Sequence, residues 1–401
     1  MKQKRKCRRR RRRRRSHRRR SLPDDIIMEI LSRLPVKTLL RFKSASKSLL
    51  NLIISLEFVK LHLRQSIVRN SNITLLHWGE ASLAYFDFDH PQRPVVQFDV
   101  HPDVIKLLES YRFENSSKLY FPIFIGICNG VVCFGKAKEF VLYNPATRDY
   151  RQIPRLRMRE LNLAIIMPND ELYRKIRFSD VFFYDCNSDD FKIFSSVHHI
   201  TTPNQNDFEF YLYSLKNNSW LKIESPPQGL RVDPSRTHIA NNSLYWVTLK
   251  DNGLQPKVIM RFDLSSHRYG EMSTPKQINP AHILRVRVLK GRPHVLILGS
   301  HFDIWMITED NFWTPVFRCL TKQCPWMYEY DSPFWRNHIS AFGYGYSRDG
   351  RKILIGPVKN PQRFICCDLV SQTTSDVQLL GLPEDVSSYA MSWAESLVLL
   401  A

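Results

Sequence analysis

The stretch that decides the fold lies near the start of the chain, where residues 21–65 read SLPDDIIMEILSRLPVKTLLRFKSASKSLLNLIISLEFVKLHLRQ. Pro23 suits the first turn of a helix, where its missing N–H costs nothing, and Asp24 complements the positive end of the helix dipole. Pro35 ends this helix and can open the next. The apolar residues between them recur at the spacing of one helix face: Ile26, Ile27, Ile30, Leu31 and Leu34.

A second apolar stripe continues the pattern after Pro35 and carries basic residues on its other faces. The stripe consists of Leu39, Phe42, Ala45, Leu49 and Ile53. A unit of about 45 residues is too short to build a self-sufficient core, so we expect it to keep apolar surface for partner helices. The alternative interpretation is an ordinary amphipathic helical hairpin with no partner.

The stretch resembles the F-box, a three-helix module. The resemblance is carried by Leu22 to Asp25, Ile30 to Lys37, Leu39 to Lys43 and Ser46 to Ser48. It implies that residues 21–65 bind the Skp-family linker protein of a cullin–RING ubiquitin ligase, and through it a cullin. The linker-binding residues that it implies are Leu22, Pro23, Ile26, Ile30, Leu31, Leu34, Pro35, Leu39, Leu40, Phe42 and Leu49. Leu49 stands where the family usually has a tryptophan, and this loss of aromatic area predicts weaker docking.

The extreme charge of the chain comes from its first twenty residues. Fifteen of the 59 Lys and Arg residues lie there, eight of them consecutive at Arg8–Arg15. Such a block repels itself and buries nothing, so we expect residues 1–20 to be a disordered tail. One interpretation is nuclear targeting, or nonspecific nucleic-acid binding through phosphates, and the other is a solvated tail without a role. The nuclear-targeting candidates are Lys4, Arg5, Lys6, Arg8, Arg9 and Arg10.

The rest of the chain has the composition of a globular protein. Its 44 basic residues nearly balance 38 acidic ones, so the formal charge falls from +21 to +6 without the tail. The eight cysteines form no C-x-x-C pair, which is typical of a reducing compartment. The longest apolar stretch, residues 120–134, is short and interrupted by Gly126 and Gly130, so we expect no membrane span. These features predict a soluble protein of the nucleus, the cytoplasm or both.

A repeated pattern begins near Pro122, where short β-rich runs alternate with clusters of Asn, Gly, Pro and Ser. Within it, a bulky apolar or aromatic residue is followed by an aromatic one seven residues later, across a polar turn. The pairs are Tyr143/Tyr150, Tyr184/Phe191, Tyr213/Trp220, Phe262/Tyr269 and Met306/Trp313, with a degenerate copy at Cys367-Asp368. The spacing of 29 to 61 residues between copies favours a β-propeller of about six hairpin blades over a single β-sandwich.

The repeat also resembles a known family. The seven-residue step is similar to that of kelch repeats but lacks their paired glycines, and the plant F-box-associated interaction domain is more similar. The segments that resemble it are residues 127–133, 143–148, 189–192, 213–220 and 262–264. The fold we expect is therefore mostly β: an F-box at 21–65, followed at 66–401 by a kelch-like β-propeller domain.

No catalytic motif appears in the sequence. H-E-x-x-H, G-x-x-x-x-G-K-[ST] and G-x-S-x-G are all absent, and His198-His199 has no other ligand at metal-binding spacing. We therefore expect a non-enzymatic subunit without a cofactor or metal. The function that the resemblance implies is substrate recognition for an SCF-type ubiquitin ligase, with the β-domain binding an unidentified target protein. The alternatives are a nuclear RNA- or DNA-associated protein acting through its Arg-rich tail, and a β-propeller enzyme.

Overall fold

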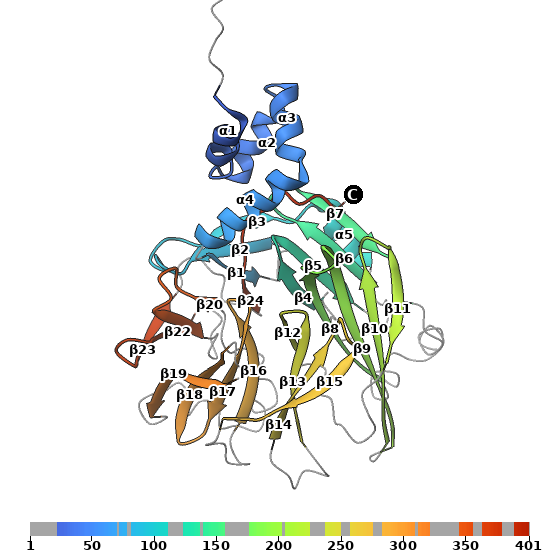
Figure 1. Ribbon diagram of the computed structural model, residues 1–401, viewed down its shortest axis with the longest axis vertical. Helices are drawn as coiled ribbons and strands as arrows, with labels where there is room; N and C mark the ends of the chain where they lie inside the picture. Colours follow the sequence, from blue (N-terminus) through green and yellow to red (C-terminus); the bar gives the residue numbers. More distant parts are fainter. Residues whose placement is uncertain are drawn as a thin grey trace, which may run out of the picture.

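The computed structural model shows a small helical body mounted on a ring of β-sheets (Figure 1). It describes residues 22–69, 72–77, 82–110, 123–136, 139–156, 176–202, 205–224, 237–249, 257–275, 283–308, 312–320, 345–355, 363–378 and 389–400. The predicted nuclear-targeting tail, residues 1–20, lies outside the described residues.

The helical body begins where the sequence predicts. The helical body consists of α1 (Asp24–Leu31), α2 (Val36–Phe42) and α3 (Lys47–Ile54), and α4 (Leu56–Arg69) connects it to the ring. A further helix, α5 (Pro102–Ser110), follows later in the chain and lies beside the ring (Figure 1). Pro23 and Pro35 cap α1 and α2 in extended conformations, and Ser46 Oγ accepts the Leu49 N–H (3.1 Å) at the start of α3. The fourth helix, which continues to Arg69, was not predicted.

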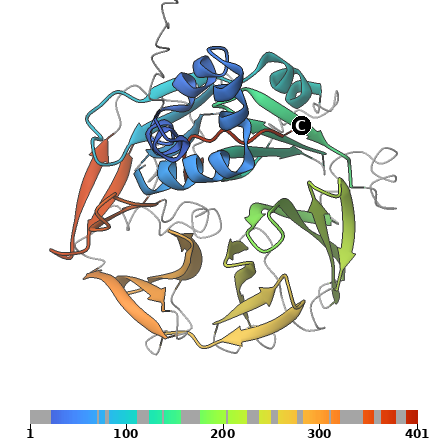
Figure 2. The same cartoon turned by 45° about the horizontal axis from the view of Figure 1, so that its top comes forward.

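The β-domain consists of six four-stranded antiparallel sheets in the described residues. In five of them the chain runs through consecutive strands: β4 (Ile123–Cys128), β5 (Val131–Lys136), β6 (Glu139–Asn144), β7 (Asp149–Ile153); β8 (Ile176–Asp185), β9 (Asp190–Thr202), β10 (Gln205–Ser214), β11 (Ser219–Ile223); β12 (His238–Ala240), β13 (Ser243–Leu249), β14 (Lys257–Asp263), β15 (Arg268–Met272); β16 (Ile283–Leu289), β17 (Arg292–Leu298), β18 (His301–Ile307), β19 (Trp313–Leu320); β20 (Gly345–Tyr346), β21 (Lys352–Ile355), β22 (Arg363–Asp368), β23 (Thr373–Gln378). The sheets stand around a common centre like the blades of a propeller (Figure 2).

The sixth sheet closes the ring with both ends of the β-domain. Its order is β24 (Tyr389–Ser392), β1 (Asn72–His77), β2 (Ser82–Asp87) and β3 (Val96–Asp99). The last strand pairs antiparallel with the first, from Ile73 opposite Ser392 to Leu76 opposite Tyr389. The ring is therefore complete only after β24 has joined the sixth sheet. With β24 in place, β1 has a paired strand on both sides.

The predicted class, helices followed by a β-propeller, is confirmed, but two details of the repeat are wrong. Tyr184/Phe191 and Tyr213/Trp220 belong to one blade, β8–β11, because they flank its first and its last hairpin turns. The sixth blade is instead the closing sheet, which lacks the repeat. Trp313 lies opposite Ile307 and not Met306, so these two aligned residues are six positions apart and not seven.

The seven-residue step arises from one kind of hairpin. Tyr143 pairs with Tyr150, Tyr213 with Trp220 and Phe262 with Tyr269, each across the turn between the third and fourth strands. Four residues form each of these three turns, and the last of them has a positive φ: Arg148 61°, Asn218 49° and His267 54°. The turn between β22 and β23 has the same length and ends at Gln372, with a φ of 56°. A polar side chain at the end of the third strand closes the turn, as when Asp263 Oδ1 accepts the Ser265 N–H (3.0 Å).

The two members of each pair have different roles. The first members, Tyr143, Tyr213 and Phe262, are buried, whereas the second members are half-buried at the outer strand. There the second aromatic donates a hydrogen bond to a backbone carbonyl just beyond the fourth strand of the preceding blade: Trp220 to Pro154 (2.7 Å), Tyr269 to Glu224 (3.1 Å) and Trp313 to Ser273 (2.6 Å). The repeat therefore encodes a link between neighbouring blades in addition to a buried cross-strand aromatic.

Another contact between neighbouring blades contains a buried histidine. His294 on β17 is fully buried; its Nδ1–H donates to the Arg292 carbonyl (2.9 Å), so its Nε2 accepts from the Tyr346 hydroxyl (2.7 Å) on β20. Burial lowers the pKa of His294 to about 4 and raises the pKa of Tyr346 to about 12. Burial of His294 therefore favours the neutral imidazole in the folded protein.

We expect stability to fall on acidification, because the unfolded chain takes up a proton at His294 before the folded chain does. The loss begins as the pH drops below about 6.5, continues towards the folded pKa of about 4, and amounts to about 2 kcal/mol at about pH 5. Thermal unfolding of wild type and His294→Gln at about pH 7 and about pH 5 measures it. The variant should show a smaller acid-induced loss, and an identical loss in both proteins would contradict the assignment.

Candidate linker-binding surface

The helical body exposes far more apolar surface than its size predicts. Seven of the fifteen exposed large apolar side chains in the described residues lie within residues 22–56. They are Leu22, Ile26, Ile30, Phe42, Leu50, Ile54 and Leu56, and together we call them the apolar head surface. An apolar concentration of this kind at a protein surface is typical of a protein–protein interface.

The structure divides the eleven predicted linker-binding residues into three groups. Exposed are Leu22, Pro23, Ile26, Ile30, Pro35 and Phe42; half-buried are Leu34, Leu40 and Leu49; buried are Leu31 and Leu39. Leu31 and Leu39 are 6% and 0% exposed because they form the core of the helical body with Val36, Ile53 and Phe58. They hold the helices together and are not available for direct contact with a partner in this conformation.

Three residues of the apolar head surface were not predicted: Leu50, Ile54 and Leu56. Leu50 and Ile54 lie one turn apart on α3, so a second apolar stripe on that helix was present in the sequence. The predicted stripe through Leu49 and Ile53 is the inward one, since Ile53 is fully buried and Leu49 packs against the core. The replacement of the usual tryptophan by Leu49 therefore affects the inside of the helical body more than its outside.

Charged side chains border the apolar head surface. Lys37 and Arg41 on α2 and Lys47 on α3 are exposed, whereas α1 begins with the exposed pair Asp24 and Asp25. The side of the surface formed by α2 and the start of α3 is thus basic. A partner with acidic groups opposite this side would associate faster and in a fixed orientation.

A buried histidine fixes the connection between α1 and α2. His62 on α4 is 2% exposed, and its Nε2–H donates to the Leu34 carbonyl (2.9 Å). Burial lowers the pKa of His62, although this hydrogen bond and Glu395 oppose the shift. The neutral imidazole thus fixes the backbone at Leu34, which is followed by Pro35. Both residues belong to the predicted linker-binding residues.

Helix α4 joins the helical body to the ring. The Lys60 ammonium lies 2.8 Å from Asp189 Oδ1, in the turn between β8 and β9, and the Tyr184 hydroxyl donates to the same carboxylate. Lys60 and Tyr184 accordingly lower the pKa of Asp189. This ion pair is partly exposed and contributes little stability by itself, but it orients α4 over the ring.

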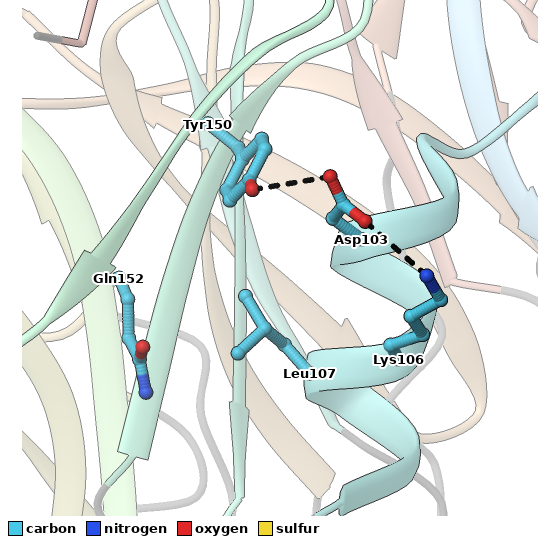
Figure 3. A pocket seen from close by; sticks show the side chains of 5 residues that line it. All are labelled: Asp103, Lys106, Leu107, Tyr150 and Gln152. Atoms are coloured by element: carbon cyan, nitrogen blue, oxygen red, sulfur yellow. Dashed lines mark hydrogen bonds and ion pairs between the residues drawn. The ribbon is translucent and has the colours of Figure 1, made fainter.

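An open depression of about 440 Å³ lies between α5 and the outer strand β7 (Figure 3). Tyr150 donates to Asp103 Oδ2 (3.4 Å), and Lys106 lies 3.6 Å from the same carboxylate. Partial burial and Asp103 raise the pKa of Tyr150, so its hydroxyl stays protonated. The depression offers no activated nucleophile, and in the described part of the chain no cluster of His, Cys, Asp and Glu has the arrangement of a metal site.

Two further features are absent from the described residues: a membrane-spanning helix and a disulfide bond. None of the helices there is long and apolar enough to cross a membrane. Cys128, Cys133, Cys186, Cys319, Cys366 and Cys367 are free thiols. Burial raises the pKa of the Cys128 thiol to about 12, so it behaves as a small apolar side chain.

The fold defines a class of proteins in which a helical module is joined to a β-propeller, and the comparisons with known proteins agree with this class. Residues 20–61 match the F-box domain, and residues 95–342 match the F-box associated beta propeller domain. The chain therefore belongs to the F-box proteins that carry an F-box associated beta propeller domain.

Similar proteins occur in Arabidopsis thaliana. F-box protein CPR1 is 26% identical over 398 residues, which cover 92% of this chain and 87% of that protein. F-box protein At4g22390 is 27% identical over 406 residues, covering 94% and 90%. Among solved structures, the dihydro-heme d1 dehydrogenase NirN is 12% identical with a TM-score of 0.34, covering 77% of this chain and 73% of that one. A likeness this low carries no inference.

Proposed function

We propose that this protein is the substrate-recognition subunit of an SCF-type cullin–RING ubiquitin ligase. The observation that carries the proposal is the apolar head surface, which lies on an F-box. Figure 1 shows the helices α1, α2 and α3, which carry most of this surface, mounted on one side of the ring. The F-box binds the Skp-family linker, and the β-propeller binds the target protein. The chain does no chemistry of its own; it raises the effective concentration of target lysines near the conjugating enzyme.

We expect burial of the apolar head surface to supply much of the binding energy, although each of its side chains is already partly buried in the free protein. Fully burying one aliphatic or aromatic side chain contributes about 1.5–3 kcal/mol, and seven such side chains are exposed. Association has an entropic cost of about 4–15 kcal/mol, so the binding energy must come from several of these side chains together. We expect Ile26 and Ile30 to be central, because they lie one turn apart on the outward face of α1.

We infer a target-binding face of the propeller from its topology. The turn after the first strand and the turn after the third strand lie on the side of the ring next to the F-box, where Asp189 meets Lys60 and Ala146 packs against the helical core. The opposite strand ends point away from the F-box. We propose that the target binds on this opposite side, where the linker and cullin leave room for it.

Co-purification tests the proposed role. Full-length wild type and a Leu22→Ala/Pro23→Ala variant are compared for recovery of the endogenous linker and cullin by affinity capture and mass spectrometry. Both residues are exposed, so the variant should stay folded while losing roughly 90% or more of the captured linker, as expected for a loss of more than 1.4 kcal/mol. Undiminished linker recovery with the variant would count against the proposal.

The Arg-rich tail supports a second proposal, nuclear enrichment. Fifteen basic residues within residues 1–20 form a signal of the type that import receptors read. Deleting residues 2–20 should reduce the nuclear fraction of a fluorescent fusion without changing linker binding or thermal stability. If the deletion instead abolishes partner binding, and this binding is sensitive to salt, the protein acts through nucleic acid and the F-box is secondary.

A further inference from the structure

The last described segment, residues 393–400, connects the ring to the F-box. It follows β24 directly, and we call it the C-terminal strap. At its start the Trp393 indole N–H donates to the Gly130 carbonyl (3.2 Å), in the turn between β4 and β5. Figure 1 shows the strap passing beneath the helical body to the neighbouring blade.

At the F-box end, the strap supplies part of the helical core. Leu397 is 1% exposed and packs with Leu39, Ile53 and Phe58. Glu395 Oε2 accepts the N–H of Val36 (3.1 Å), the first residue of α2. This N–H has no partner within its own helix, so the strap both fills the core and caps α2.

At the ring end, the strap is held by blade β4–β7. The Asn144 side chain is fully buried and donates to the carbonyls of Ser396 (3.1 Å) and Val398 (2.8 Å). Asp149 Oδ2 accepts the Leu400 N–H (2.5 Å), and the Arg151 guanidinium donates to the Leu400 carbonyl (3.3 Å). Losing the contacts with the strap would leave the fully buried Asn144 amide without these partners, which costs free energy.

A glycine in the turn between β4 and β5 leaves room for the strap. Gly130 has a φ of +79°, and a Cβ on it would lie 2.6 Å from Ser396 Oγ and 2.7 Å from the Ala394 carbonyl oxygen. The same turn in blade β16–β19 has Gly291 at a φ of +71°, where a Cβ would meet nothing within 4 Å. Both turns need glycine for the backbone, but only Gly130 must also admit the strap.

We propose that the C-terminal strap makes the stability and orientation of the F-box depend on closure of the propeller. The F-box is the first part of the folded chain, yet its core is complete only when residue 397 arrives. The strap continues directly from β24, which pairs with β1, so we expect that pairing to bring the strap into place. A chain with an open ring therefore presents an F-box with an unfilled core. The proposal does not rest on linker binding.

Hydrogen–deuterium exchange on the full-length protein without any partner tests the proposal. Gly130→Ala is compared with its matched control Gly291→Ala, since both introduce the same backbone strain and only the first displaces the strap. We expect exchange of the α2 and α3 amides to become about tenfold faster or more in Gly130→Ala than in Gly291→Ala. The strand amides of the blades distant from the strap should remain equally protected in both.

A second pair of variants acts on the strap itself. Leu397→Ala removes the side chain that enters the F-box core, and Leu399→Ala changes an exposed leucine of the same segment. Only Leu397→Ala should accelerate exchange in the F-box, again by about tenfold or more. If Gly130→Ala unfolds the ring as well, this pair decides. Equal F-box protection in Leu397→Ala and Leu399→Ala would overturn the proposal.

Discussion

An Ile26→Asp/Ile30→Asp variant is expected to lose binding to the Skp-family linker by a factor of about 100 or more while keeping the stability of the wild type. Both side chains are about half exposed, at 48% and 50%, so neither substitution opens a cavity. In the complex, however, each carboxylate would be buried against apolar groups without a partner, and such burial costs several kcal/mol. Calorimetric titration measures the affinity, and thermal unfolding of the free protein measures the stability.

The matched control for this experiment lies on the propeller. Leu221 on β11 is 60% exposed and belongs to neither the F-box nor the C-terminal strap. Leu221→Asp introduces the same charge change per site and should leave the linker affinity unchanged. If Ile26→Asp/Ile30→Asp binds the linker as tightly as Leu221→Asp does, the apolar head surface is not the linker-binding surface.

The second large effect is expected at one aromatic pair of the propeller. Tyr213→Ala should destabilise the β-domain by about 3–5 kcal/mol, because the ring is fully buried between blades β4–β7 and β8–β11. Its cross-strand partner Trp220 is only half-buried, so Trp220→Ala should cost less, about 2 kcal/mol, including its hydrogen bond to Pro154. Denaturant unfolding of both variants measures the difference.

Conservative substitutions separate packing from hydrogen bonding at this pair. Trp220→Phe keeps much of the contact with Phe140, whose ring centroid is 5.7 Å away, and removes only the indole N–H, so we expect a loss of about 1 kcal/mol. A loss for Trp220→Ala equal to or greater than that for Tyr213→Ala would contradict the distinction between a buried first member and a linking second member.

Local patterns in the sequence were sufficient for the helices and the hairpins. Pro23, Pro35 and the apolar period between them determine where α1 and α2 begin, and both effects act over one or two turns. In the same way, the seven-residue step in the β-domain predicts the hairpins at Tyr143, Tyr213 and Phe262, because the partners are close in sequence.

Features that depend on distant segments could not be predicted in this way. The closing blade joins β24 to β1 across some 300 residues, and neither strand carries the repeat. The contribution of Leu397 to the F-box core has the same origin, since nothing in the sequence around it distinguishes it from Leu399 or Leu400. Such contacts are decided by the way in which the ring closes.

The sequence predicted which helices carry the candidate site. It did not predict which face of each helix is exposed. Helical periodicity identifies an apolar stripe but does not say whether that stripe faces a core or a partner. Leu31 and Leu39 were therefore assigned to the linker although they are buried, while Leu50 and Ile54 were not assigned although they are exposed. Burial separates the two cases because it depends on α4 and the C-terminal strap, which cover one side of the helical body.

The central claim, that the apolar head surface of this F-box binds a Skp-family linker, is tested most directly by titrating the purified full-length protein with a purified linker. The titration is carried out at about 0.15 M and at about 1 M salt, because apolar contacts survive screening and contacts of the Arg-rich tail do not. We predict one-to-one binding that is retained at high salt and after deletion of residues 2–20. A folded protein that does not bind the linker, or binds it only at low salt and through the tail, would contradict the account.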